Sequence, residues 1–348
     1  MSEVGTIGIL GGGQLGRMLS VAASRLGLRC HVYEPGAAPA GDVAHAVTTA
    51  PYEDEAALRA FAESVDVITY EFENVPTSAL DLLESLRPIR PNRRALAVSQ
   101  DRLTEKTFLN EIGLATAPFA DVPAEGDLAA AVERIGRPAI LKTRRMGYDG
   151  KGQVRIGADD GDGPAEWTGA PSVREGFVDF SAEISVIVAR GADGRVAAFD
   201  PGLNVHRDGI LRTTTVPCGL PARVTTDAVL IAGRIVNALD YIGVMGVELF
   251  VTPQGLIVNE IAPRVHNSGH WTQAGCAVDQ FEQHVRAVAG LPLGDGRRYA
   301  DVVMENLIGD DLDRVPEWLA MPDVQVHLYG KGAARPGRKM GHVNRIAR

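Results

Sequence analysis

Residues Val247 to Trp271 read VELFVTPQGLIVNEIAPRVHNSGHW, and this stretch decides how the rest of the chain is interpreted. Two apolar runs flank the segment Thr252 to Gly255, in which proline presets a turn and glycine closes it, so the pattern predicts a β-hairpin. Each strand carries a carboxylate, Glu248 early in the first and Glu260 late in the second. A tight connection would place Glu248 opposite Asn259, whereas a β-bulge would place it opposite Glu260. The sequence leaves both registers open.

Two carboxylates at one level of a hairpin favour a metal site, because like charges on paired strands repel and need a compensating cation. Mg²⁺ is usually held by one or two carboxylates together with nucleotide phosphates, and Mn²⁺ accepts similar oxygen ligands. The structural alternative is that one glutamate faces solvent on an edge strand. The run that follows, from Pro263 to Trp271, is polar and rich in cationic residues, and is therefore an unusual ending for a purely structural hairpin.

The run from Asn259 to Trp271 closely resembles the signature of the 5-(carboxyamino)imidazole ribonucleotide synthase family, ATP-grasp enzymes of purine biosynthesis. The resemblance implies that Glu248 and Glu260 bind the metal, and that Asn259 and Glu260 contact ATP. The residues that it implies for holding bicarbonate or carboxyphosphate are Arg264, Asn267 and His270. Those that it places near the ribonucleotide substrate are His266, Asn267 and Ser268.

Length and composition indicate a multidomain globular protein. At 348 residues, two or three domains are expected, and 45% hydrophobic with 23% charged residues is ordinary for such a chain. The net charge of −9 argues against a nucleic-acid-binding protein. We find no apolar run of the roughly 20 residues that a membrane helix needs, and no signal pattern, so we expect a cytoplasmic protein. Cys30, Cys218 and Cys276 are far apart and are expected to be reduced thiols.

The first residues predict a nucleotide-binding type of fold. Thr6 to Leu10 reads as a buried strand, Gly11 to Gly16 as a glycine-rich turn, and Arg17 to Leu26 as a helix; a second strand ends at Glu34. The spacing fits a dinucleotide fingerprint, so an NAD-dependent dehydrogenase is an alternative. The resemblance implies instead that this domain holds the substrate, with Gln14 and Leu15 at the contact.

A further strand, Val65 to Tyr70, is followed directly by Glu71 and Glu73. Ligands of open α/β sheets bind at the carboxyl ends of the strands, which places both acids at or near the cleft. The structural alternative is that one of them caps the helix after Pro76. The resemblance favours substrate binding by both.

A second cationic, glycine-rich region runs from Lys142 to Gln153. Lys142 ends a predicted strand, and the loop that follows could fold over a triphosphate; it lacks the ending of a P-loop and starts no helix. Upstream, Arg102 and Lys106 lie four residues apart and hence on one face of a predicted helix. The resemblance implies that Arg102 and Lys142 contact ATP, with Lys142 also catalytic, and leaves Lys106 open.

The loop closely resembles the family's ATP-covering loop, which implies nucleotide contacts for Gly147, Tyr148, Asp149, Gly150, Lys151, Gly152 and Gln153. Tyr148 and Lys151 would also lie near the substrate. Relatives often carry arginine where this chain has Lys151, and lysine cannot reproduce the bidentate geometry. Asp149 is a candidate general base.

Three further positions match the family's nucleotide site. The adenine-binding strand corresponds to Glu175, Gly176, Phe177 and Val178. Glu183 corresponds to the acid that contacts the sugar, and His206 to a further nucleotide contact; spacing alone would indicate only strands and a loop.

The last residues are strongly basic. From Lys331 onward there are six Lys and Arg residues and no acid, which predicts an anion site. The resemblance implies that Lys331 and Arg338 reach the substrate phosphate. A nucleic-acid-binding tail is the competing interpretation, but the interleaved glycine, proline and apolar residues favour a packed segment.

We therefore expect three domains: residues 1–97, a doubly wound Rossmann-like substrate domain; 98–295, an ATP-grasp domain; and 296–348, a small C-terminal domain. The activity that the resemblance implies is ATP-dependent carboxylation of 5-aminoimidazole ribonucleotide (AIR) with bicarbonate, through carboxyphosphate. ATP and Mg²⁺ are the expected cofactors, a homodimer is the expected assembly, and neither nucleic acid nor membrane is an expected partner. Another ATP-grasp ligase, such as a formate-dependent transformylase, and a non-catalytic nucleotide-binding regulator are the remaining alternatives.

Overall fold

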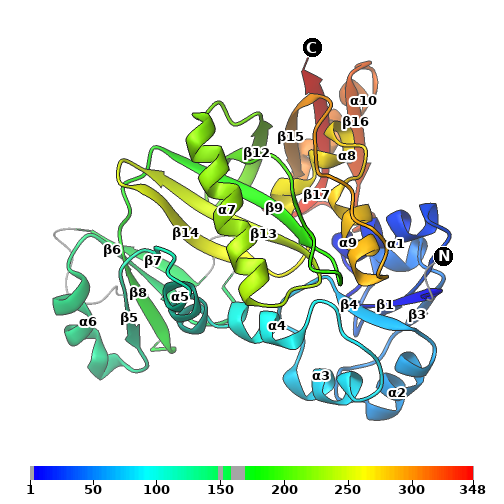
Figure 1. Cartoon of the computed structure of the whole chain (residues 1–348), viewed down its shortest axis with the longest axis horizontal. Helices are drawn as coiled ribbons and strands as arrows, with labels where there is room; N and C mark the ends of the chain where they lie inside the picture. Colours follow the sequence, from blue (N-terminus) through cyan, green and yellow to red (C-terminus); the bar gives the residue numbers. More distant parts are fainter. Residues whose placement is uncertain (1–3, 148–151, 158–168, 348) are drawn as a thin grey trace.

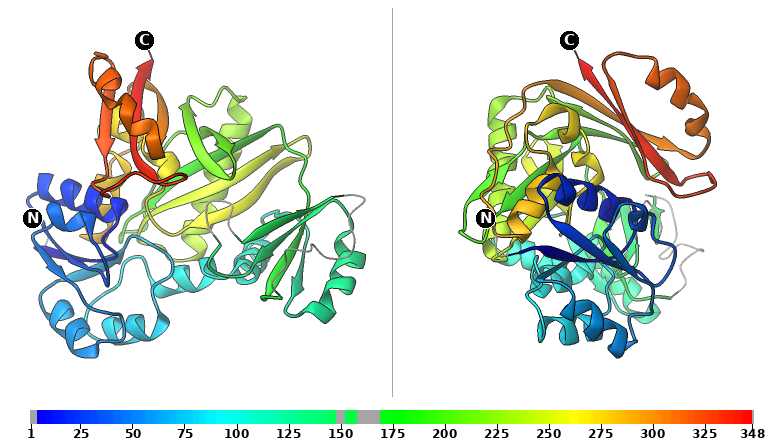
Figure 2. Two further views of the ribbon diagram at one scale, coloured as in Figure 1. Left: turned by 180° about the vertical axis from the view of Figure 1, so that it is seen from behind. Right: turned by 90° about the vertical axis from the view of Figure 1, so that its right-hand side faces the viewer.

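The structure is a computed structural model that describes residues 4–147, 152–157 and 169–347. In these ranges the chain forms three β-sheets, one of nine strands and two of four. Figure 1 shows one four-stranded sheet set apart from the rest of the molecule, and the N- and C-terminal parts of the chain close to each other. The views from behind and from the side in Figure 2 show the same arrangement.

A parallel sheet of order β3-β2-β1-β4 forms the N-terminal part. Its elements are β1 (Thr6–Leu10), α1 (Gln14–Arg25), β2 (Arg29–Tyr33), the 3-10 turn η1 (Pro39–Asp42), β3 (Ala46–Thr48), α2 (Glu55–Glu63), β4 (Val67–Tyr70) and α3 (Thr77–Glu84). Ile7 and Ile9 pack in one core with α1, whereas Leu10 packs in another with α2 and α3. Burial on both faces explains why these strands are almost continuously apolar.

Two helices, α4 (Arg93–Ser99) and α5 (Arg102–Glu111), lead to the second four-stranded sheet, of order β5-β8-β6-β7. Its elements are β5 (Phe119–Val122), η2 (Glu125–Asp127), α6 (Leu128–Ile135), β6 (Ala139–Thr143), β7 (Gln153–Ile156) and β8 (Ser172–Gly176). Asp101 caps α5 by accepting from Leu103 N and Thr104 N, and it also binds the guanidinium of Arg144. One carboxylate therefore ties the start of α5 to the end of β6.

The nine-stranded antiparallel sheet has the order β14-β13-β9-β11-β12-β15-β17-β16, with β10 paired to β9. Its first elements are β9 (Ala182–Arg190), β10 (Val196–Ala198), β11 (Gly202–Arg207), β12 (Ile210–Val216), α7 (Ala222–Ala238), β13 (Gly243–Thr252), β14 (Gly255–Ala262), η3 (Asn267–Gly269), α8 (Thr272–Gly275) and α9 (Gln280–Val288). Val186 and Val188 of β9 pack with α7, and Ile187 between them packs with Phe281 of α9. The two helices thus cover opposite faces of this sheet.

The C-terminal part continues the same sheet through β15 (Asp301–Ile308), η4 (Gly309–Arg314), α10 (Val315–Leu319), β16 (Val324–Leu328) and β17 (Lys339–Ala347). β15 pairs with β12, and Thr213 lies opposite Glu305. Leu307, Trp318 and Val343 form a small separate core here. The domain boundaries expected near residues 97 and 295 stay predictions.

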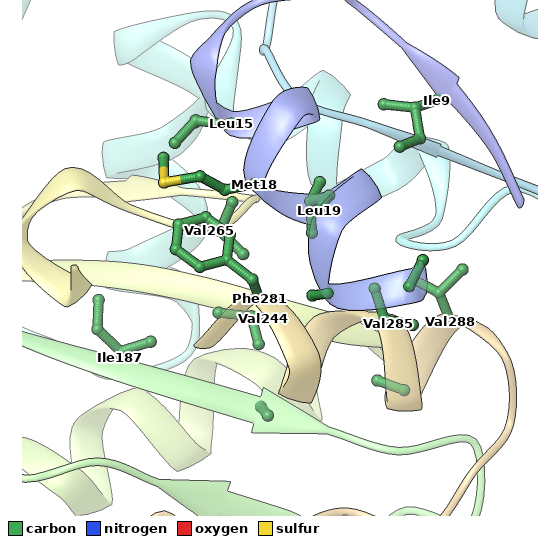
Figure 3. Packing of buried hydrophobic residues seen from close by; sticks show 14 of the residues in the cluster. Ile9, Leu15, Met18, Leu19, Ile187, Val244, Val265, Phe281, Val285 and Val288 are labelled. Carbon is green, nitrogen blue, oxygen red and sulfur yellow. The ribbon is translucent and has the colours of Figure 1, made fainter. Parts of the chain in front are cut away.

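The N-terminal sheet and the large sheet share one hydrophobic core. Figure 3 shows Met18 and Leu19 of α1 above Phe281 and Val285 of α9. Fully burying side chains of this size contributes about 1.5–3 kcal/mol each. The carboxyl ends of the N-terminal strands are therefore held in a fixed position relative to the hairpin β13–β14.

The predicted α/β class is confirmed, and so is the hairpin. Helix α7 ends at Ala238, because Asp240 adopts a left-handed conformation with φ 46°. The three cysteines are free and buried. Within the described ranges we find no helix whose length and apolar character would let it span a bilayer.

Candidate active site

Glu248 and Glu260 lie directly opposite each other on β13 and β14. The register changes between Leu249, which pairs with Val258, and Glu248, so that Asn259 is the extra residue of a β-bulge. The bulged alternative left open by the sequence is therefore the one adopted. Both side chains keep some exposure, 17% for Glu248 and 38% for Glu260, so a ligand can reach them.

The two carboxylates differ in electrostatic environment. Partial desolvation and the charge of Glu260 raise the pKa of Glu248 to about 7. Desolvation also acts on Glu260, but the charges of Arg102 and Lys142 outweigh it and hold the pKa of that carboxyl below its ordinary value. A cation at Glu248 would relieve the repulsion between the pair.

The donors present fit a hard divalent cation. Besides the two carboxylates, Asn259 Oδ1 is buried without a hydrogen-bond partner among the described residues. In the part of the chain that the structure describes, no group of three or more His, Cys, Asp and Glu side chains could hold a metal ion. A site of two carboxylates completed by nucleotide phosphates is the usual arrangement for Mg²⁺.

Helix α5 covers the edge of β14. Arg102 Nη1 donates to Glu260 Oε2 at 3.1 Å, and Glu105 Oε1 accepts from the backbone N–H of Ile261 at 2.6 Å. Desolvation and the nearby Glu260 raise the pKa of Glu105 to about 8. One turn of helix thus fixes the backbone of β14 at Ile261 and the side chain of Glu260, and covers the edge of the sheet.

Three buried charged side chains, from Glu175, Lys142 and Lys106, join α5 to the small sheet. Glu175 Oε2 accepts from Lys142 Nζ at 3.0 Å and lies 3.2 Å from Lys106 Nζ. Lys106 Nζ also lies 3.5 Å from the carbonyl oxygen of Asn259. Burial opposes ionisation of Glu175, but the two lysines outweigh it and keep its pKa below the ordinary value. Glu175 Oε1 has no partner among the described residues, so one acceptor is available for a ligand.

The remaining residues predicted for the nucleotide lie on β8, β9 and β11 or directly after β8. Glu183 Oε2 and His206 Nδ1 are 2.6 Å apart; burial lowers the histidine's basicity, but Glu183 and Glu248 raise its pKa overall. Gly176 is the last residue of β8, and Phe177 follows it. The ring of Phe177 is partly exposed and lies beneath the guanidinium of Arg155. Val178 follows them, before β9.

The glycine-rich loop begins and ends at adjacent points of one hairpin. Thr143 N–H donates to Gly152 O at 2.7 Å, and Gln153 pairs with Lys142. Gly147 is the last described residue before the loop's middle. Four predicted residues, Tyr148, Asp149, Gly150 and Lys151, lie outside the described residues.

The polar run after β14 meets the N-terminal sheet. Arg264 Nη2 lies 2.6 Å from Glu73 Oε1, while Arg264 Nε is buried without a partner among the described residues. Burial opposes ionisation, but Glu73 and neighbouring acids raise the pKa of Arg264, so it stays cationic. A predicted catalytic residue and a predicted substrate residue are therefore in contact, with one guanidinium N–H left for an anion.

His266 and Asn267 follow Arg264 closely. His266 Nε2 lies 3.5 Å from Glu248 Oε1, and burial with the positive charges of Arg264 and Lys339 lowers its pKa well below the ordinary value. Asn267 exchanges two 2.8 Å hydrogen bonds with the amide of Asn306. His266 is thus held beside Glu248, and Asn267 is held by its paired amide.

Two residues of the run are turned inward. Ser268 is 1% exposed, and its hydroxyl binds Ser185 and His266. His270 is fully buried and packs against Phe281 and His342. The structure therefore does not bring the imidazole of His270, predicted to hold bicarbonate, into the group around the two glutamates.

The glycine-rich turn at β1 is filled by carboxylates of the chain itself. Glu71 accepts from the backbone N–H groups of Gly13 and Gly16, and Glu34 accepts from that of Gly12 at 2.8 Å. These are the amides that would face a pyrophosphate in a dinucleotide-binding domain. This arrangement argues against the NAD alternative.

The predicted substrate residues of the N-terminal domain flank this turn. Gln14 begins α1, and Leu15 beside it is buried in the core, so the backbone of Leu15 is the part that could meet a ligand.

The basic C-terminal segment lies near the same helix. Lys331 Nζ lies 5.5 Å from the ring centroid of Tyr329, and Gly330 lies beside Arg17 of α1. Arg338 precedes β17, with its carbonyl bound by Gly309 N–H. The basic C-terminal segment thus reaches the start of α1.

Sequence reasoning missed several residues of the site. Lys339 contributes charge at Glu248, His206 and His266. Glu105 binds the backbone of Ile261, next to Glu260, and Asn306 binds Asn267. Lys106 had been named from its position one turn from Arg102, with its role left open, whereas Asn306 lies 39 residues from its partner and nothing local marks it.

Comparisons with known proteins agree along the whole chain. Family models match as the ribonucleotide synthetase pre-ATP-grasp domain over residues 4–100, the ATP-grasp domain over 107–281, and the phosphoribosylaminoimidazole carboxylase C-terminal domain over 302–348. N5-carboxyaminoimidazole ribonucleotide synthase of Brucella melitensis is 54% identical over 347 residues, which is 98% of this chain and 96% of that protein.

Solved structures show the same relationship. The ADP complex of an N5-carboxyaminoimidazole ribonucleotide synthetase superposes with a TM-score of 0.95 at 38% identity, covering 98% of this chain and 92% of that one. The Aspergillus clavatus synthase in complex with ADP and AIR superposes with a TM-score of 0.90 at 31% identity, covering 100% and 95%. The chain therefore belongs to the N5-carboxyaminoimidazole ribonucleotide synthase family of ATP-grasp ligases.

Proposed function

We propose that this protein catalyses the ATP-dependent carboxylation of AIR by bicarbonate, giving N5-carboxyaminoimidazole ribonucleotide, ADP and phosphate in purine biosynthesis. One observation carries the proposal. The facing carboxylates Glu248 and Glu260 lie between cations of the nucleotide side, Arg102 and Lys142, and the cation Arg264, which contacts the N-terminal sheet.

The first step is phosphoryl transfer from ATP to bicarbonate. An oxygen of bicarbonate attacks the γ-phosphorus, the bond to the β–γ bridging oxygen breaks, and carboxyphosphate and ADP form. Lys142 supplies positive charge to the transferring group, and Arg102 holds Glu260 in place. The residues that would hold Mg²⁺ are Glu248 and Glu260, with Asn259 Oδ1 as a further oxygen; the ion would neutralise charge on the phosphates.

Arg264 and the two residues after Val265 are suited to bind the carboxylate acceptor. Arg264 presents a buried N–H without a protein partner, and His266 presents a ring nitrogen beside Glu248. Asn267 is oriented by its paired amide Asn306. Donors fixed before the ligand arrives stabilise developing negative charge without reorganisation.

The second step joins the carboxyl carbon to AIR. The exocyclic amine attacks this carbon, directly or as released CO₂, phosphate leaves, and the amine loses a proton. Glu71 and Gly330, which precedes Lys331, lie at the first turns of α1, where a ribonucleotide would be bound, and Glu73 lies beside Arg264. Asp149 as the general base, and closure of the loop 147–153 over the labile intermediate, stay predictions from the family resemblance, as does a homodimer.

Phosphate release from ATP and Mg²⁺ with bicarbonate, measured with and without AIR, tests the proposal. We expect AIR to stimulate release, with equal amounts of ADP and carboxylated ribonucleotide formed. Intact ATP binding without stimulation by AIR would overturn the substrate assignment.

A further inference from the structure

The run from His266 to His270 is supported from behind by a buried polar network. The loop lies directly on β13, because a Cβ atom on Gly246 would come within 2.7 Å of the Cβ of His266. Gln280 accepts from His266 N–H at 2.9 Å and donates to His266 O at 2.8 Å. The backbone of His266 is thereby fixed, and the question is what fixes its ring.

Two serines connect the ring to the sheet. Ser185 lies on β9 directly opposite Glu248 of β13, and its Oγ is 2.6 Å from Ser268 Oγ. Ser268 Oγ is in turn 2.8 Å from His266 Nδ1. Ser185 and Ser268 are 2% and 1% exposed, so water does not compete for these bonds.

Two hydroxyls in a row could point their protons in either direction. The backbone decides, because the peptide N–H of Ser268, which can only donate, is directed at His266 Nδ1 at 3.4 Å. Nδ1 must therefore accept. Ser185 then donates to Ser268, and Ser268 donates to Nδ1.

The position of Nε2, on the other side of the His266 ring, also favours a proton on Nε2 and none on Nδ1. With Nδ1 an acceptor, a neutral imidazole carries its proton on Nε2. Nε2 lies 3.5 Å from Glu248 Oε1, where a lone pair would be repelled and an N–H is attracted. The two ends of the ring thus specify one tautomer.

We propose that Ser185 and Ser268 are positioning residues that hold His266 in its Nε2–H tautomer, so that the ring offers one N–H donor beside the carboxylate pair. This inference rests on the proposed function, in which that donor meets bicarbonate or carboxyphosphate. It also changes the role of Ser268, whose hydroxyl is committed to His266 and does not contact the substrate. Ser185 acts only through Ser268.

Because the two serines form one chain, their effects are not additive. We expect Ser268→Ala to lower kcat on the order of 10-fold and Ser185→Ala about 3-fold, with the KM for ATP unchanged. The double variant should be no slower than Ser268→Ala. A serine that contacted the substrate would instead raise the KM for AIR, and an effect of Ser185 independent of Ser268 would multiply with it; either result overturns the proposal.

Ser20→Ala is a matched control. Ser20 is 2% exposed and donates one hydrogen bond to Gly16 O at 2.9 Å, so the substitution removes a buried hydroxyl of the same kind elsewhere. It should match the others in thermal stability and keep wild-type turnover. Equal losses of turnover in all three variants would show a general structural effect and would overturn the proposal.

The ring nitrogens can be observed directly. In protein labelled with ¹⁵N-histidine, the His266 signals, identified by their loss in His266→Gln, should show a protonated Nε2 and an acceptor Nδ1. Ser268→Ala should shift the Nδ1 signal or mix the tautomers. A wild-type spectrum with the proton on Nδ1 overturns the inference, whether or not AIR stimulates phosphate release, so failure of the inference and failure of the proposed function remain distinguishable.

Discussion

Two buried polar regions flank the hairpin β13–β14, and they are built in different ways. The first, which we call the ion cluster, consists of Arg102, Lys106, Lys142, Glu175 and Glu260 and holds its groups through charge. The second, which we call the neutral network, consists of Ser185, His266, Ser268, Gln280 and the amide pair Asn267–Asn306, and is joined by hydrogen bonds between uncharged groups.

The difference follows from what each region must do. In the proposed function, nucleotide phosphates bring negative charge to the ion cluster, so lysine and arginine side chains must be available there. Glu175 and Glu260 compensate the repulsion between these cations. The neutral network fixes the direction of two uncharged donor groups, His266 and Asn267, and directional hydrogen bonds suffice for this. Removing a member of the ion cluster should therefore affect binding or stability, and at Glu260 turnover as well, whereas removing a member of the neutral network should affect turnover alone.

The largest expected effect is at Glu248 and Glu260, the pair that we propose to bind the metal. Glu260→Gln removes the charge that faces Glu248 and binds Arg102, so we expect turnover to fall by about 10³-fold, in the range of lost electrostatic stabilisation. Titration with Mg²⁺ should show a higher requirement for the ion. Turnover within a few-fold of wild type at the same Mg²⁺ concentration would contradict the assignment of Glu260 to the metal.

Glu175→Ala tests the ion cluster through stability. The change leaves Lys106 and Lys142 buried without their shared partner, and breaking a buried pair in this way costs about 3–5 kcal/mol. Urea unfolding, read as the free energy of unfolding, measures this. A loss below 1 kcal/mol would mean that Glu175 does not compensate the two lysines.

His284 tests whether a buried histidine that is held by hydrogen bonds between uncharged groups stays neutral. His284 accepts from Val244 N–H and bonds Thr69 Oγ1, and burial lowers its pKa from 6.5 to about 3. The folded state thus binds fewer protons, so the stability contribution is complete above pH 6.5 and is lost as the pH falls toward 3. His284→Gln, which keeps a donor and an acceptor, should reduce the loss of unfolding free energy between pH 6.5 and 5 by about 2 kcal/mol. An unchanged pH slope would show that His284 is not held neutral.

The smallest effect is expected at a surface ion pair. Arg223 and Asp227 lie one turn apart on α7, 3.8 Å from each other and largely exposed. Arg223→Ala should change the free energy of unfolding by less than about 0.5 kcal/mol, because solvent screens the pair. A loss comparable to that of Glu175→Ala would remove the distinction between buried and exposed charge on which the comparison rests.

Elements that depend on a short stretch of sequence could be predicted from the sequence alone. The hairpin and the glycine-rich turn follow from apolar runs and turn residues, and the family resemblance supplied the candidate nucleotide-site residues, which stay predictions. The pairing of Glu248 with Glu260 could not be predicted, because the backbone at the Asn259 bulge is held by residues about 150 positions earlier. Lys106 donates to Asn259 O, and Glu105 accepts from Ile261 N–H.

Contacts between distant elements account for the rest. Ser185 reads as an ordinary strand residue, and only the pairing of β9 with β13 places it beside Glu248. His270 carries the same chemical signal as His266, yet it lies on the inward side of the same short turn and packs against Phe281. Residue type identified candidates for the site, but the direction of each side chain depended on the fold.

The most direct test of the account compares Glu260→Gln with Ser268→Ala in two assays, MgATP affinity by calorimetry and AIR-stimulated phosphate release. The account predicts that Glu260→Gln loses affinity and turnover, whereas Ser268→Ala keeps wild-type affinity and loses turnover alone. Equal loss of MgATP affinity in both variants would contradict the division between an ion cluster that binds and a neutral network that orients.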